Sequence, residues 1–116
     1  MTIKEFYEVV GGDYEETVTR MMGEARVRKY IGRFAENTTF IKLEENMKNG
    51  DYENAFLEAH NLKGMSMNIG VTELAEVSSE LTEALRNGPK GDVNGLFEAV
   101  KEKYEKVIDL MQGIEE

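Results

Sequence analysis

The sequence predicts an all-α fold, an up-and-down antiparallel four-helix bundle with short additional helices at the N-terminus. Three observations lead to this prediction. The chain of 116 residues contains a single proline, Pro89, so little interrupts a helical backbone. Its apolar residues recur at the helical period, and the period-two alternation of strands is absent. The loops between periodic segments are short, which favours antiparallel neighbours, and we expect one domain over residues 1–116.

Capping side chains and glycines delimit each expected helix in turn. Three short helices should come first. The first begins at the capping box formed by Thr2 and Glu5 and ends at Gly11, the second runs from Asp13 to about Met22, and the third runs from Glu24 to Asn37. Four more should follow, from Thr38 or Thr39 to Asn49, from Asp51 to Gly70, from Thr72 to the Asn87-Gly88-Pro89 stop, and from Asp92 through Met111. The flexible methionines are expected to fill gaps in the core, namely Met21, Met22, Met47, Met65 and Met111.

Composition excludes several classes of function. The formal net charge is −9, so the phosphates of nucleic acids and anionic membrane surfaces would be repelled. No apolar run approaches the ~18 residues of a membrane-spanning helix, and the N-terminus lacks a signal-peptide pattern. The chain has no cysteine, which rules out thiol catalysis and thiolate metal sites. We therefore expect a cytoplasmic protein whose partners are other proteins, without nucleic acid or membrane.

One histidine, His60, is the candidate reactive residue, because it is the only nitrogen or sulfur side chain here that is a good nucleophile near neutral pH. It should lie off the buried stripe of its helix. Leu57, Lys63, Gly64 and Met67 fall within about 60° of it on the helix surface. This pattern favours a phosphoryl-accepting histidine on an exposed face.

The neighbours of His60 suit that chemistry. Gly64 costs roughly 1 kcal/mol of helix stability relative to alanine, and its missing side chain would leave the imidazole open to a bulky donor. Lys63 can offset the charge of a phosphoryl group, and Leu57 and Met67 can form the apolar part of a docking patch. Since no GxxxxGK(S/T) motif is present, the phosphoryl group should come from another protein rather than from ATP.

The stretch from Ala59 to Gly70 resembles the A-H-x-L-K-G-x-x-x-x-(L/I)-G signature of histidine phosphotransfer (HPt) domains, the relay modules of multistep two-component signalling. In this resemblance His60 matches the phosphoacceptor, Lys63 the adjacent lysine and Gly64 the small residue that keeps the imidazole accessible. The segments 49–52 and 81–86 are also similar to the turn before the histidine helix and to the helix after it.

The resemblance implies a four-helix bundle that exchanges a phosphoryl group with an aspartate of a response-regulator receiver domain, or receives it from a hybrid sensor histidine kinase. The magnesium ion of that exchange belongs to the receiver, so no metal and no cofactor is expected in this chain. Two residues depart from the family pattern. Met65 replaces a common serine or alanine and could narrow access or alter docking. Thr82 stands where some members have a glutamine or other polar residue facing the histidine, and we expect it to contact the partner together with Leu57 and Met67.

Other functions fit the sequence less well. A di-metal bundle needs Glu-x-x-His pairs, yet Leu57 precedes His60 by three residues and no second histidine exists. A haem ligand would lie in a buried pocket, whereas His60 is expected off the core. The main alternative is a non-catalytic interaction module that docks a partner through the His60 face. The phosphoacceptor domain of a chemotaxis-type kinase is a further variant.

Overall fold

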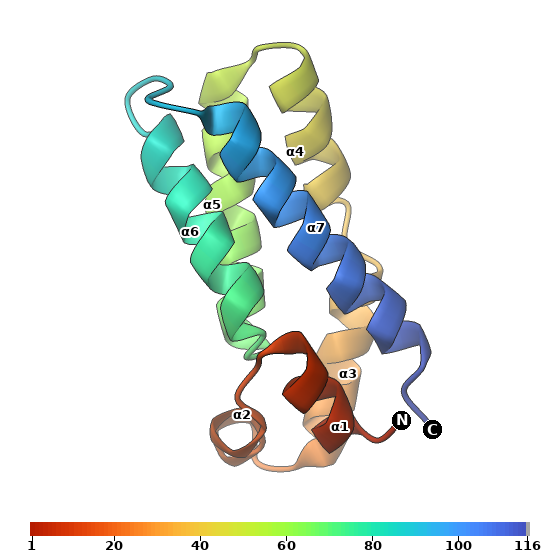
Figure 1. Ribbon diagram of the computed structural model, residues 1–116. Helices are drawn as coiled ribbons and strands as arrows, with labels where there is room; N and C mark the ends of the chain where they lie inside the picture. Colours follow the sequence, from red (N-terminus) through yellow and green to blue (C-terminus); the bar gives the residue numbers. More distant parts are fainter. Residues whose placement is uncertain (116) are drawn as a thin grey trace.

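The computed structural model describes residues 1–115, and within them the chain forms helices and no strand. Their bounds are α1 Ile3–Val10, α2 Tyr14–Met21, α3 Glu24–Ala35, α4 Thr39–Lys48, α5 Tyr52–Asn68, α6 Thr72–Leu85 and α7 Val93–Gln112. Helices α4 to α7 run up and down as a bundle, and α1, α2 and α3 lie at its lower end (Figure 1). The predicted fold class, including the short N-terminal helices, is confirmed. Among the described helices we find none with the length and apolar content needed to cross a membrane.

Side-chain caps begin several helices where the sequence predicted them. Thr2 and Glu5 form the expected reciprocal capping box at α1. Asp13, Asp51 and Asp92 each accept a hydrogen bond from a backbone N–H in the first turn of α2, α5 and α7. These bonds satisfy donors that a helix start otherwise leaves unpaired, so they fix where the histidine-bearing helix α5 begins.

Two local expectations, for Thr72 and Met22, are wrong, and the one for Thr38 holds in position but without the side-chain bond. Thr72 is the first residue of α6 rather than its cap, and the capping position belongs to Val71, which has no polar side chain. Thr38 caps α4 without a side-chain bond, because the Oδ1 atom of Asn37 accepts from the N–H of Phe40 instead. Met22 is 80% exposed rather than buried, because it ends α2 in the left-handed conformation at a φ of 63°.

Small residues bring α5 and α6 close together. The buried face of α5 carries Ala55, Ala59, Leu62 and Ser66. The facing part of α6 is also small and includes buried Ala75, Ser78 and Thr82. Side chains of this size let two helix backbones approach at the short end of the usual 8–10 Å range. The tight α5–α6 pair therefore forms a firm base for the outer face of α5.

The N-terminal helices cap the C-terminal end of α5. Four successive carbonyls there accept hydrogen bonds from residues 7–20. Arg20 Nη2 donates to Met67 O at 3.3 Å and to Asn68 O at 2.8 Å. Tyr7 Oη donates to Ile69 O at 2.5 Å, and the N–H of Asp13 donates to Gly70 O at 3.0 Å. Since the last carbonyls of a helix lack partners within the helix, this segment completes α5 from outside.

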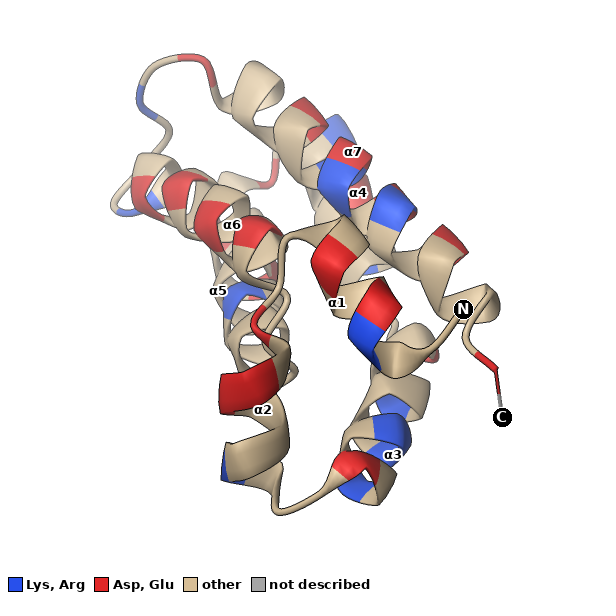
Figure 2. Ribbon diagram, turned by 60° about the horizontal axis from the view of Figure 1, so that its bottom comes forward, with Lys and Arg blue, Asp and Glu red and all other residues tan. Residues whose placement is uncertain are grey.

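Charge is spread unevenly over the bundle. Figure 2 shows acidic residues along the exposed side of α6 and basic residues gathered on α3. The basic residues of α3 are Arg26, Arg28, Lys29 and Arg33. On α5, Lys63 is the only lysine or arginine, although the chain as a whole carries a net charge of −9. A single positive charge therefore marks the middle of this helix.

Candidate functional site

His60 lies in the middle of α5 with its side chain exposed to solvent. Ala59, one position before His60, and Leu62, two positions after it, are both fully buried in the core. One residue corresponds to a rotation of about 100° on a helix, so His60 is turned away from the face that these neighbours bury. The predicted exposure of the imidazole is confirmed, and its ring nitrogens can be reached from outside the bundle.

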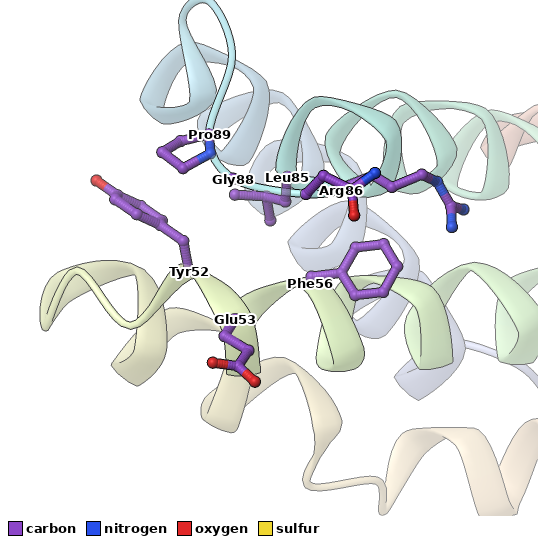
Figure 3. Close-up of a pocket in the computed structure, with 8 residues that line it drawn as sticks. Tyr52, Glu53, Phe56, Leu85, Arg86, Gly88 and Pro89 are labelled. Carbon is purple, nitrogen blue, oxygen red and sulfur yellow. The ribbon is translucent and has the colours of Figure 1, made fainter.

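Two side chains that the sequence analysis did not assign to the site support the imidazole. The ring of Phe56, one helical turn earlier, stacks on the His60 ring with centroids 6.3 Å apart and an interplanar angle of 19°. The guanidinium carbon of Arg86 lies 5.0 Å from the centroid of the Phe56 ring. Figure 3 shows the Arg86 side chain extended over Phe56 from the end of α6. Imidazole, phenyl ring and guanidinium thus form a continuous group across α5 and α6.

Arg86 is held in this position by Glu83. Its Nε and Nη2 atoms donate to the two carboxylate oxygens of Glu83 at 2.9 and 3.1 Å. The hydrogen bond from Arg86 lowers the pKa of the Glu83 carboxyl, with further lowering from the charges of Arg86, Lys63 and Lys90. Lys63 is therefore within electrostatic reach of α6, and within residues 1–115 it forms no salt bridge of its own. Lys63 follows His60 by three residues on α5, and its role in offsetting a negative charge on His60 stays a prediction.

Gly64 opens the space beside His60 on the C-terminal side. A Cβ atom built on Gly64 would meet no other group within 4 Å, so the missing side chain corresponds to open solvent rather than to a close helix contact. Helix packing therefore gives no reason for a glycine here. An access role for Gly64 remains a prediction, and this open space supports it.

The two apolar residues predicted for the docking patch are exposed as expected. Leu57 is 52% exposed and Met67 is 57% exposed. They are ten residues apart, about 15 Å along the helix axis, with His60 and Lys63 between them. The backbone of Met67 is held by Arg20 of α2, so the N-terminal cap borders this face.

The predictions for Thr82 and Met65 need correction. Thr82 is fully buried, and its hydroxyl donates to the Ser78 carbonyl at 2.7 Å, so it cannot face a docked partner. Its short side chain satisfies its own polar group within α6 instead of reaching outward. Met65 is half-buried against the core, about 140° around the helix from His60, so it does not narrow access to the imidazole.

Metal chemistry finds no support in the residues that the structure describes. No group of three or more histidine, aspartate and glutamate side chains within residues 1–115 is arranged to hold a metal ion. What the site does offer is an accessible imidazole, a neighbouring cation, open space and exposed apolar flanks. This combination suits the reversible transfer of a small anionic group between proteins.

Comparison with protein families matches residues 30–110 to the Hpt domain. The match covers the end of α3, all of α4, α5 and α6, and most of α7, so it includes every residue of the site described above. Helices α1 and α2, which cap α5, lie outside it. Neither the curated proteins nor the solved structures gave a match to the chain.

Proposed function

The chain belongs to the Hpt domain family, whose members carry phosphoryl groups on a histidine in phosphorelays, and from this we propose that His60 is its phosphoacceptor. His60 is the only histidine in the sequence, so a family that works through phosphohistidine leaves no other candidate. Its exposure in the middle of α5 is the observation that supports the assignment best. The partners that we propose are a response-regulator receiver domain and a hybrid sensor histidine kinase, and the proposed location is the cytoplasm.

The proposed reaction is an in-line exchange between two proteins. The unprotonated imidazole nitrogen of His60 attacks the phosphorus of an aspartyl phosphate on the receiver. A nitrogen–phosphorus bond forms, the phosphorus–oxygen bond to the aspartate breaks, and the carboxylate leaves with the bonding electrons. The reverse reaction passes the group to the next receiver. Phosphoryl transfer depends mainly on positioning and charge stabilisation, which an exposed site on a firm helix supplies.

Neighbouring residues take supporting roles in this proposal. Lys63 offsets the charge of the phosphoryl group, and the free space at Gly64 admits the incoming phosphoaspartate. Leu57 and Met67 contact the receiver on either side of His60. The chain acts as a phosphocarrier without an ATP site of its own, and we propose that residues 1–116 form one domain.

The test is to incubate the protein with phosphorylated receiver domains and magnesium, and to measure acid-labile phosphate by intact mass and peptide mapping. We expect one phosphoryl group on His60 in the wild-type protein. The His60→Gln variant should carry none and should keep its helical circular dichroism, because the side chain is exposed. Loss of helicity in this variant would assign His60 a structural role.

Phosphoramidate provides a second test that needs no partner protein. The imidazole nitrogen takes the phosphoryl group, the phosphorus–nitrogen bond of the donor breaks, and ammonia leaves. Phosphorylation of His60 by phosphoramidate without transfer from any receiver would show a competent histidine but favour a different partner. No phosphorylation by either donor would favour the non-catalytic interaction module.

A further inference from the structure

A hollow of about 570 Å³ opens one helical turn from His60, between the start of α5 and the end of α6. Tyr52 and Phe56 of α5 form one side, and Leu85 and Pro89 form the other (Figure 3). The side chain of Arg86 lies across the end nearest His60. Four of the eight lining residues are aromatic or aliphatic, although the hollow faces solvent.

We propose that this hollow is the specificity pocket of the receiver-docking face, and that it takes an apolar side chain of the receiver. The inference rests on the proposed function, since it concerns the partner that exchanges phosphoryl groups with His60. Phe56 links the two places physically, because its ring lines the hollow and also stacks on the His60 imidazole. A partner that touches the reacting nitrogen therefore lies beside the hollow.

The area of a protein interface carries the argument further. Even a weak, transient complex buries roughly 1,000 Å² in total, or a disc about 13 Å in radius on each partner. The Phe56 centroid is 6.3 Å from the His60 centroid, about half that radius. A receiver centred on His60 would thus reach the Phe56 end of the hollow, and water trapped against this apolar lining would be unfavourable. An inserted apolar side chain removes that cost and gives the interface an anchor.

Charge at the hollow disfavours an anionic occupant. The one cation of its lining, Arg86, is already paired through two hydrogen bonds with Glu83. The carboxylate of Glu53, which also belongs to the lining, points away from the loop that carries Gly88 and Pro89 (Figure 3). An anionic group entering the hollow would lose hydration without gaining an unpaired cation, which is costly.

The experiment places a carboxylate in either wall of the hollow, in Tyr52→Asp and Pro89→Asp. Tyr52 is the first residue of α5, where negative charge is favourable, and Pro89 lies outside the helices, so both variants should fold. The matched control is Val9→Asp, which changes an apolar residue, 46% exposed, on α1 at the opposite end of the bundle (Figure 1). Each protein is phosphorylated in parallel by phosphoramidate and by the phosphorylated receiver.

We expect all variants to react with phosphoramidate at the wild-type rate. With the receiver, the second-order rate constant for transfer should fall tenfold or more in Tyr52→Asp and Pro89→Asp and should stay unchanged in Val9→Asp. The transfer rate of the two pocket variants at saturating receiver should equal that of the wild-type protein. If both pocket variants accept phosphoryl groups from the receiver as efficiently as the wild-type protein, the pocket proposal is overturned and the proposed function stays intact.

A binding measurement covers the case in which no receiver transfers to the wild-type protein. Unphosphorylated receiver domains are then titrated into labelled protein, and amide shifts are followed by NMR. Shifts at Gly88 and Phe56 that Pro89→Asp abolishes would support the pocket although the relay proposal had failed. Absence of binding, or binding that leaves these residues unchanged, would overturn it.

Discussion

At the scale of single residues, Gly64 leaves open space beside His60 but lowers the stability of its helix. Glycine is the least favourable non-proline residue in a helix interior, by about 1 kcal/mol relative to alanine. Since a Cβ atom at this position would meet nothing within 4 Å, packing does not require the glycine. The open space at Gly64 is what the proposed access role requires.

We predict that Gly64→Ala and Gly64→Gln both stabilise the protein, by about 0.5–1 kcal/mol in urea unfolding, because each restricts the unfolded chain and favours helix. Gly64→Ala should transfer phosphoryl groups at close to the wild-type rate. Gly64→Gln should be slower by tenfold or more, because its longer side chain would stand beside the imidazole. Equal transfer rates in the two variants would contradict the access role.

Residue roles could be predicted from the sequence where they depend on one helix alone. The exposure of His60, Leu57 and Met67 follows from helical periodicity, and the structure confirms it. Thr82 and Arg86 depend instead on how α6 turns against α5, which periodicity does not fix. Thr82 was expected to face the partner and is buried. Arg86 was not assigned to the site, and its guanidinium lies over the Phe56 ring.

At the scale of elements, the C-terminal end of α5 depends on α1 and α2. Carbonyls at residues 67–70 all accept hydrogen bonds from this N-terminal segment, and the one from Tyr7 is buried. The caps at helix starts were predictable, because a side chain and its backbone partner are three residues apart. This cap was not predictable, because its two halves are far apart in the sequence and no local pattern joins them.

Tyr7→Phe tests this contact by removing the hydroxyl and leaving the Ile69 carbonyl unsatisfied. We expect a loss of about 1–3 kcal/mol in the free energy of unfolding, the usual cost of an unpaired buried acceptor. The circular dichroism spectrum of the folded variant should show no loss of helix, because the phenyl ring still occupies the site of the tyrosine ring. An unchanged free energy of unfolding would mean that water satisfies the carbonyl equally well.

Tyr7→Phe should also change how the melting temperature depends on pH in the alkaline range. Burial raises the pKa of Tyr7 above its ordinary value, so the folded state holds this proton more tightly than the unfolded chain does. The resulting stability is complete below pH ~10 and is lost as the pH rises beyond that value. Above pH ~10 the melting temperature of the wild-type protein should therefore fall more steeply than that of Tyr7→Phe. Parallel curves would contradict this assignment.

At the scale of the whole molecule, two salt bridges tie α7 to its neighbours in the bundle. Lys101 pairs with Glu44 of α4, and Lys103 pairs with Glu73 of α6, each at 3.0 Å. The general architecture, four amphipathic helices with short connections, could be predicted from periodicity and from glycine positions. These cross-helix pairs could not, because they depend on the rotation of α7 about its axis.

Lys103→Gln should reveal how acid weakens the bundle. The hydrogen bond from Lys103, followed by its charge, lowers the pKa of the Glu73 carboxyl, so this pair stabilises the fold above pH ~4.5 and stops doing so as the pH falls through the lowered pKa. Because both side chains are partly exposed, the effect at pH 7 should stay under about 1 kcal/mol. The difference in melting temperature from the wild-type protein should be present at pH 7 and should shrink as the pH is lowered below ~4.5. A difference that does not shrink in acid would point to packing of the lysine stem.

The cap on α5 also sets an order of events during folding. Tyr7 meets Ile69, 62 residues later, and Gly11 accepts a hydrogen bond from the N–H of Glu73. Helices α1 and α2 have eight residues each, too few to persist alone in water. These two helices should therefore stay unstructured until the α5–α6 turn has been made. In pulsed hydrogen exchange we expect α1 and α2 to gain protection last, so that the helix carrying His60 acquires its final turn only when these two helices pack against it.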